Sequence, residues 1–231
     1  MDEHRTGVSA LEPEELELLG DLRGKRVLHL ACSTCDEGIT MASRGARVVG
    51  VDISETHVRV GLEKAEALGV EFDLRVGDMM NLDADLRDFD LVYISSGGIC
   101  WVPDLDDWMT GVTNTLRPGG HILISEHHPI WETLGVAGDR QLTVLNDYFE
   151  QHELPEIVDP TKSAIGKAET SGDENLLQSF IWGIGSVVSA LIRHDFQILA
   201  LLELPDPSMF RGLGDAAACV PAVYRLMGKR G

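Results

Sequence analysis

One stretch, KRVLHLACSTCDEGITMASRGARVVGVDIS at residues 25–54, constrains the fold more than any other part of the chain. Two short apolar runs, which begin at Val27 and Ala46, have the length of buried parallel strands. Residues 36–43 between them suffice for about two helical turns, which fits a crossover helix. Asp52 ends the second strand, where open parallel sheets place ligand-binding groups. The stretch therefore predicts a strand-helix-strand unit with a nucleoside site at its end.

Strand and helix signals continue to alternate after this unit, which predicts a doubly wound, mostly parallel α/β sheet. Pro221 interrupts the last apolar run. We expect strands at 70–76, 90–95, 120–125, 196–203 and 218–227, and helices at 11–20, 54–69, 104–116 and 185–194.

The chain length predicts one domain, residues 1–231, because 231 residues suffice for a single α/β domain with a lid. The alternation breaks down over residues 130–175, where prolines and glycines stand among charged residues and allow one strand near 142–148. A connection that long inside a compact domain is usually functional or disordered. We interpret it as a lid over the substrate.

Charge and composition exclude several partners. Lys and Arg number 19 against 38 Asp and Glu, a net charge of −19 that disfavours nucleic acid and anionic membranes. The first fifteen residues lack an apolar core segment and no run approaches a membrane span. The four cysteines do not form a disulfide-rich pattern, so a cytoplasmic protein is expected. The partner is then a small molecule, and a homodimer stays open.

Cys32 and Cys35 form a CxxC, but the second pair that would complete a zinc site is missing. Two histidines and a glutamate at 126–128 have the residue types of a metal triad, yet adjacent strand positions do not converge on one ion. We expect no metal, and we interpret the two cysteines as small side chains that line a tight turn.

Five segments in order, VLHLAC, RVVGVDIS, RVGDMMNL, DFDLVYISSGGICWVPDL and LRPGGHILISEHHP, resemble the class I methyltransferases that use S-adenosylmethionine. The resemblance covers roughly residues 16–204 and is closest to bacterial small-molecule enzymes. It implies a seven-stranded Rossmann-like sheet whose last two strands form an antiparallel hairpin. Where the family commonly has three glycines, this chain has Ala31, Ser33 and Cys35. A positive φ there would cost about 1–2 kcal/mol per residue.

The resemblance implies a role for each candidate cofactor residue. Asp52 would accept hydrogen bonds from the ribose hydroxyls and Ile53 would pack beside the adenine. Asp78 would bind the adenine amino group, and the Ser95 carbonyl would face the cofactor ammonium. The full set of expected cofactor-binding residues is His29, Ala31, Cys32, Ser33, Asp52, Ile53, Asp78, Met79 and Ser95.

Glu126, His127 and His128 are the candidate catalytic residues, because imidazole can take a proton from a nucleophile near neutral pH. Family members often have an acid, a variable residue and His-Pro here, which makes His128 the first choice for base or substrate ligand. Trp182 stands where relatives commonly carry a histidine, and its indole would favour an apolar or aromatic substrate. Trp101, Trp182, Met209 and Phe210 are the expected substrate-pocket residues.

The sequence thus predicts a methyltransferase that acts on an O or N atom of a small molecule, such as a secondary metabolite. Two alternatives stay open because of the substituted glycines and Trp182. One is a protein of this fold that binds the cofactor but catalyses a rearrangement or cyclisation. The other is a binding protein whose cofactor site has decayed.

Overall fold

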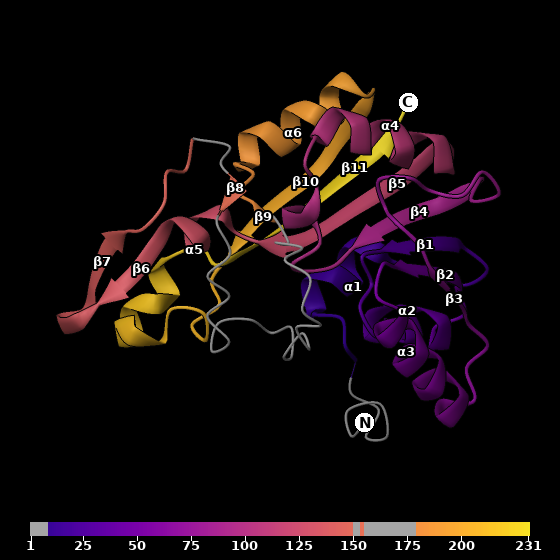
Figure 1. Cartoon of the computed structure of the whole chain (residues 1–231), viewed down its shortest axis with the longest axis horizontal. Helices are drawn as coiled ribbons and strands as arrows, with labels where there is room; N and C mark the ends of the chain where they lie inside the picture. The colour runs from indigo at the N-terminus through magenta and orange to yellow at the C-terminus, as the bar shows by residue number, and fades with distance from the viewer. Residues whose placement is uncertain (1–8, 150–152, 155–178) are drawn as a thin grey trace, which may run out of the picture.

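The computed structural model describes residues 9–149, 153–154 and 179–231. A seven-stranded sheet in the order β10-β11-β5-β4-β1-β2-β3 forms its body (Figure 1). The sheet has a parallel part made of β3, β2, β1, β4 and β5, in that spatial order. β11 lies between β5 and β10 and is antiparallel to both. The strands are β1 Arg26–Leu30, β2 Arg47–Asp52, β3 Asp73–Val76, β4 Phe89–Ile94, β5 Leu116–His127, β10 Phe196–Leu204 and β11 Val223–Arg230. This is the predicted doubly wound sheet with its antiparallel hairpin.

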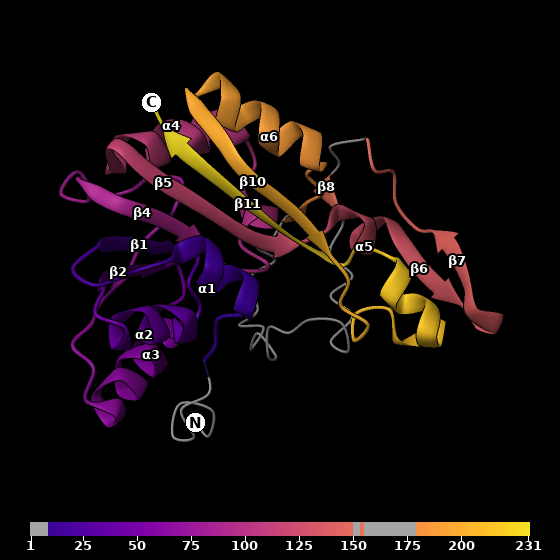
Figure 2. The same ribbon diagram turned by 180° about the vertical axis from the view of Figure 1, so that it is seen from behind.

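Helices cover both faces of the sheet (Figure 2). Side chains of α1 (Pro13–Leu19) and α2 (Asp36–Ser43) are buried in one cluster, and α3 (Glu55–Leu68) packs beside them against β2 and β3. On the other face, α4 (Leu105–Thr115) and α6 (Ile184–Arg193) cover β4, β5 and β10. Strand order reverses between β1 and β4, so the adjoining strand ends form the crevice where such sheets bind ligands.

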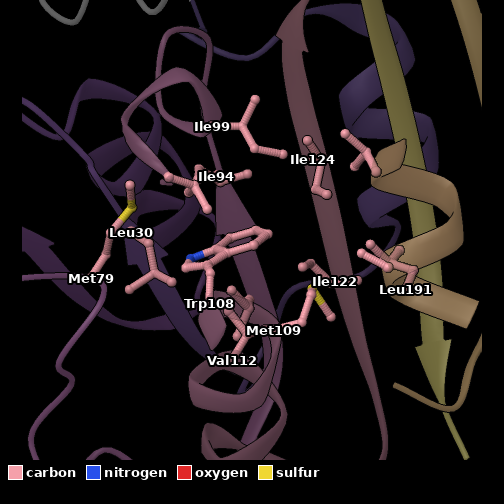
Figure 3. Close-up of a cluster of buried hydrophobic side chains, with 14 of the residues drawn as sticks. Leu30, Met79, Ile94, Ile99, Trp108, Met109, Val112, Ile122, Ile124 and Leu191 are labelled. Carbon is pink, nitrogen blue, oxygen red and sulfur yellow. The ribbon is translucent and has the colours of Figure 1, made fainter. Parts of the chain in front are cut away.

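The largest hydrophobic cluster lies under α4 and α6 (Figure 3). Trp108 of α4 is fully buried among Leu30, Ile94 and Ile122, which come from three adjacent strands. Burial of such large side chains contributes about 1.5–3 kcal/mol each. This cluster fixes the positions of the strand ends that carry the candidate site.

Local sequence signals set the helix boundaries. The Ser54 hydroxyl accepts the His57 N–H at 3.3 Å and so caps α3, which ends at Gly69 with a φ of 67°. The Asp104 carboxylate accepts the N–H groups of Asp106 and Asp107 and caps α4 in the same way. These helices therefore begin and end within one or two residues of the prediction.

A smaller outer unit follows β5. It contains α5 (Pro129–Thr133), the hairpin of β6 (Leu134–Ala137) and β7 (Gln141–Val144), and the 3-10 segments Gly138–Arg140 and Arg211–Cys219. β8 (Glu153–Leu154) pairs antiparallel with β9 (Ser179–Phe180), and Ile99–Trp101 form a further 3-10 turn. The proposed lid over 130–175 starts in this unit, while residues 150–152 and 155–178 lie outside the described part of the chain.

Three predicted strand boundaries were wrong. The third strand begins at Asp73 rather than at residue 70, and the fifth extends back to Leu116 through the Pro118 turn, beyond a register shift against β4. The final strand begins at Val223 and not at 218, because residues 211–219 form 3-10 turns and Pro221 has no N–H for the ladder. No helix in the described ranges is long and apolar enough to span a bilayer.

Candidate functional site

The turn after β1 keeps a glycine-type backbone without glycines. Ala31, Ser33 and Cys35 have φ values of 47°, 51° and 60°, all in the left-handed region. The Cys35 N–H donates to the Cys32 carbonyl at 2.7 Å, which closes the tight turn expected from the sequence. Left-handed geometry at each residue costs about 1–2 kcal/mol, so other contacts must hold the turn.

Side-chain contacts supply that support from both sides. The Ser33 N–H donates to Asp52 Oδ2 at 2.7 Å, which ties the turn to the end of β2. On the outer side, Lys64 Nζ of α3 donates to Thr34 Oγ1 at 2.8 Å and to both oxygens of Asp36. Sequence reasoning missed this clamp, because nothing in the local sequence links Lys64 to residues thirty positions earlier.

Asp52 is buried at the end of β2 and organises two segments. Besides the Ser33 N–H, its carboxylate accepts the Ser54 N–H at 3.0 Å and lies 3.3 Å from His57 Nδ1. The side chain of Ile53 beside it is 75 % exposed. The ribose contact expected of Asp52 and the adenine contact expected of Ile53 stay predictions.

Asp78 follows β3 on the adjacent strand end and is exposed. Its Oδ1 accepts the Met80 N–H at 2.8 Å, and the Gly77 N–H donates to the Asp52 carbonyl at 3.0 Å. Met79 is buried and belongs to the main hydrophobic cluster. The structure therefore brings Asp52 and Asp78 to neighbouring strand ends, as predicted.

His29 lies beneath the turn and not in the crevice, in contrast to its prediction as a cofactor residue. Its ring is fully buried, with Nδ1 3.2 Å from Cys35 Sγ and Nε2 3.1 Å from Ser95 Oγ. Burial lowers the pKa of His29 to about 3, so the ring is neutral near physiological pH. Burial also raises the pKa of Cys35, and the neighbouring Cys32 thiol adds to this. The side chains of His29, Cys35 and Ser95 form an uncharged network that supports the turn.

Glu126 holds backbone rather than facing the crevice as a free acid. Its Oε1 accepts the N–H groups of Gly97 and His127, and its Oε2 accepts the Ile99 N–H at 2.8 Å. The residue is 3 % exposed. Its carboxylate fixes the loop after β4, so the structure makes Glu126 a positioning residue and corrects its placement among the proton-transfer groups.

His128 is also structurally engaged. Its Nδ1 accepts the Ile130 N–H at 3.1 Å and caps α5, so this nitrogen carries no proton. The protonated Nε2 then lies 2.9 Å from Glu203 Oε1 as its donor partner. The residue is 2 % exposed and neither nitrogen is free to accept a proton. This geometry does not favour His128, the first choice from the sequence, as the base.

His127 differs from its neighbour in both exposure and contacts. Its side chain is 32 % exposed, and its ring packs against Trp131 with centroids 5.1 Å apart. Its Nδ1 lies 3.8 Å from Glu126 Oε1, too far for a good hydrogen bond. Among the three residues 126–128, His127 alone therefore has an accessible imidazole.

The four predicted pocket residues divide into two groups. Trp101 packs against the main cluster after β4, and Trp182 Nε1 donates to the Val102 carbonyl at 2.8 Å. Phe210 is 2 % exposed and belongs to the small core of the outer unit, where Met209 packs beside it. Phe210 is therefore an interior packing residue, which corrects its assignment as a pocket wall.

The residues at the crevice fit the adenosine part of S-adenosylmethionine. Asp52 Oδ2 accepts one backbone N–H, from Ser33, and as a carboxylate oxygen retains a lone pair for a ribose hydroxyl. Ile53 offers an exposed apolar surface, and the exposed Asp78 is one strand away. Among the described residues, the imidazole of His57 lies 3.3 Å from Asp52 Oδ1.

Part of the chain is similar to known methyltransferases. Residues 27–120 match the family described as "Methyltransferase domain". Demethylmenaquinone methyltransferases from Bacillus cytotoxicus and Bacillus cereus are 32% and 31% identical over 121 residues, 51% of this chain and 51% of theirs. The chain therefore matches about half the length of these curated relatives.

Solved structures show the same fold over nearly the whole chain. An S-adenosylmethionine-dependent methyltransferase from Mesorhizobium loti superposes with a TM-score of 0.74, at 22% identity and with 94% of this chain and 96% of that one covered. The cyclase SpnF superposes with a TM-score of 0.60 at 16% identity, covering 94% and 80% of the two chains. With the domain matched at residues 27–120 and the seven-stranded sheet, these likenesses show that the chain has the fold of the class I methyltransferases that use S-adenosylmethionine.

Proposed function

We propose that this protein transfers a methyl group from S-adenosylmethionine to an O or N atom of a small molecule. The observation that carries the proposal is the pair Asp52 and Asp78 on adjacent strand ends, with Ile53 exposed beside them. These residues would hold the adenosine, and the supported turn at residues 31–35 would approach the amino-acid end. The bound cofactor supplies an electrophilic methyl group, so no protein nucleophile is required.

The protein's own contribution is then to position the acceptor and remove its proton. Methyl transfer is an in-line displacement, for which orientation is the main catalytic effect. We propose that His127 accepts this proton, because its imidazole is accessible whereas His128 caps a helix. Glu126 would act indirectly, because it holds the loop of residues 97–99 that borders the reacting groups.

Small-molecule chemistry has independent support. The net charge of −19 disfavours nucleic acid, and the curated relatives are named for a small organic acceptor, demethylmenaquinone. A role in secondary metabolism and a cytoplasmic location remain parts of the proposal.

Two measurements test the proposal. Calorimetry should detect S-adenosylmethionine binding, and a panel of phenols, amines and carboxylic acids should include an acceptor that yields S-adenosylhomocysteine. His127→Ala should lower kcat by about 10²- to 10⁴-fold without changing cofactor affinity. His121→Ala, at the other end of β5, is the matched control and should leave kcat unchanged. Full activity of His127→Ala would remove that residue from the mechanism.

A second candidate is a cyclisation or rearrangement in the same crevice. The likeness to the cyclase SpnF shows that this fold is compatible with such chemistry, although fold alone does not determine a reaction. The two candidates differ in cofactor consumption. Stoichiometric formation of S-adenosylhomocysteine with product favours methyl transfer, while product without it favours the second candidate.

A further inference from the structure

His57 lies at the candidate nucleoside site and has no role in the proposed function so far. It belongs to the first turn of α3, which follows β2 after Ile53 and Ser54. Its backbone N–H donates to the capping hydroxyl of Ser54 at 3.3 Å, and its Nδ1 lies 3.3 Å from Asp52 Oδ1. The side chain is 34 % exposed. His57 therefore contacts the acid at the end of β2 and is accessible to a ligand.

The contact with Asp52 determines which nitrogen of His57 remains available. A carboxylate only accepts hydrogen bonds, so Nδ1 carries a proton and is the donor in this pair. Nε2 has no hydrogen-bond partner within residues 9–149, 153–154 and 179–231. It is an acceptor in the neutral ring and a donor in the charged ring. Because a hydroxyl can both donate and accept, Nε2 can bind a hydroxyl in either state.

Asp52 alone has too few open positions for the two hydroxyls of a ribose. A carboxylate offers about four lone-pair sites, shared equally between its oxygens. Oδ1 accepts the Ser54 N–H at 3.0 Å and faces the His57 Nδ1–H, so both of its sites are used. Oδ2 accepts the Ser33 N–H at 2.7 Å and keeps one site. The second hydroxyl of the ribose therefore needs another partner.

We propose that this chain divides the ribose between two residues, with one hydroxyl on Asp52 Oδ2 and the neighbouring hydroxyl on His57 Nε2. The inference rests on the proposed function, because it concerns the cofactor of that reaction. It differs from the expectation drawn from the sequence, in which Asp52 bound both hydroxyls. The contact of Nδ1 with Asp52 orients the imidazole, and the opposite nitrogen meets the ligand. The site should therefore reject nucleosides that lack either hydroxyl.

The competing explanation is that His57 only occupies Asp52 Oδ1 and leaves it when the ribose binds. His57→Ala would then free Oδ1 and tighten cofactor binding. A third explanation is that His57 only holds Asp52 in place. His57→Asn separates this role from ribose binding, because its side-chain amide keeps a donor near the position of Nδ1 but has no group at the position of Nε2.

The test uses S-adenosylhomocysteine and its 2′-deoxy and 3′-deoxy analogues as probes, with calorimetry on the full chain. The wild type should bind S-adenosylhomocysteine about tenfold more tightly than either analogue, the preference expected for one hydrogen bond. His57→Asn should lose the preference against one analogue and keep the preference against the other, whose missing hydroxyl would meet Asp52. Two unchanged preferences in His57→Asn, tighter binding by His57→Ala, or a wild type that does not bind S-adenosylhomocysteine each overturn the proposal.

His194→Ala is the matched control, since His194 and Asp106 form the same kind of pair away from the crevice. His194 Nε2 lies 3.1 Å from Asp106 Oδ1, where the end of α6 meets the start of α4. This substitution should leave both preferences unchanged. The measurement also separates the inference from the methyl-transfer function. Retained preferences without turnover of any acceptor would refute methyl transfer alone, whereas turnover with unchanged preferences in His57→Asn would refute the role of His57 alone.

Discussion

Replacement of Ser33 by glycine tests whether the turn after β1 stores backbone strain. Ser33 is exposed, has a φ of 51°, and makes its contact to Asp52 through the backbone, which Ser33→Gly retains. Relief of the left-handed geometry is worth about 1–2 kcal/mol. The greater freedom of glycine in the unfolded chain offsets about 0.4–1 kcal/mol of this. The expected net stabilisation is about 0.5–1 kcal/mol.

Urea denaturation and calorimetry measure this effect directly. For a chain of this size the expected gain corresponds to a rise in Tm of about 1–4 °C. Ala137→Gly is the matched control, because Ala137 is exposed and has a φ of −79°. In Ala137→Gly the greater freedom of glycine in the unfolded chain is not offset by any relief of strain, so the free energy of unfolding should fall by about 0.5–1 kcal/mol. If Ser33→Gly destabilised the protein as much as Ala137→Gly does, the strain argument would be refuted.

The remaining predictions concern charge. Asp52→Ala should weaken S-adenosylmethionine binding by about 1–3 kcal/mol in calorimetry, the loss expected for hydrogen bonds to a charged group, and it should also lower Tm because the Ser33 and Ser54 N–H groups lose their acceptor. Burial, with Asp36 nearby, raises the pKa of Glu37 from 4.5 to about 7, so its contribution to stability is present below pH 4.5 and is lost as the pH rises through 7. Glu37→Gln should remove that decline in a series of urea titrations between pH 4.5 and 8. His29 has the opposite effect on the pH dependence of stability. Because its pKa is lowered, stability should be lost as the pH falls from 6.5 towards 3, and His29→Gln should reduce this loss.

The elements that could be predicted from the sequence are those with local signals. Ser54 and Gly69 define α3 because a hydroxyl cap and a left-handed C-cap act within one turn of the helix. The placement of Asp52 and Asp78 on neighbouring strand ends could be predicted because strand ends in a parallel sheet meet at one edge. The end of the chain was misjudged, because the apolar residues of the 211–219 segment pack in the outer unit rather than in the sheet.

Contacts between distant segments could not be predicted. His128 was chosen from its neighbours in sequence, but its role depends on Glu203, which β10 brings close after 75 residues. That the buried Tyr224 hydroxyl has no hydrogen-bond partner among the described residues is likewise visible only after β11 has been placed between β5 and β10. Sequence patterns predict which edge of the sheet carries the candidate residues, whereas the contacts and exposure of each group follow from the tertiary structure.

The substitutions around the turn make most sense as a coupled set. Cys35 has a side chain where relatives commonly have glycine. Its sulfur contacts His29 Nδ1 and occupies the space beside Gly38 and Gly50. An added Cβ on Gly38 would lie 2.5 Å from that sulfur, and one on Gly50 would lie 2.9 Å from it. Residue 35 has therefore lost the conformational freedom of a glycine, but the absence of side chains at Gly38 and Gly50 leaves room for its sulfur. This compensation explains how the turn retains its conformation with different residues, and it argues against a decayed cofactor site.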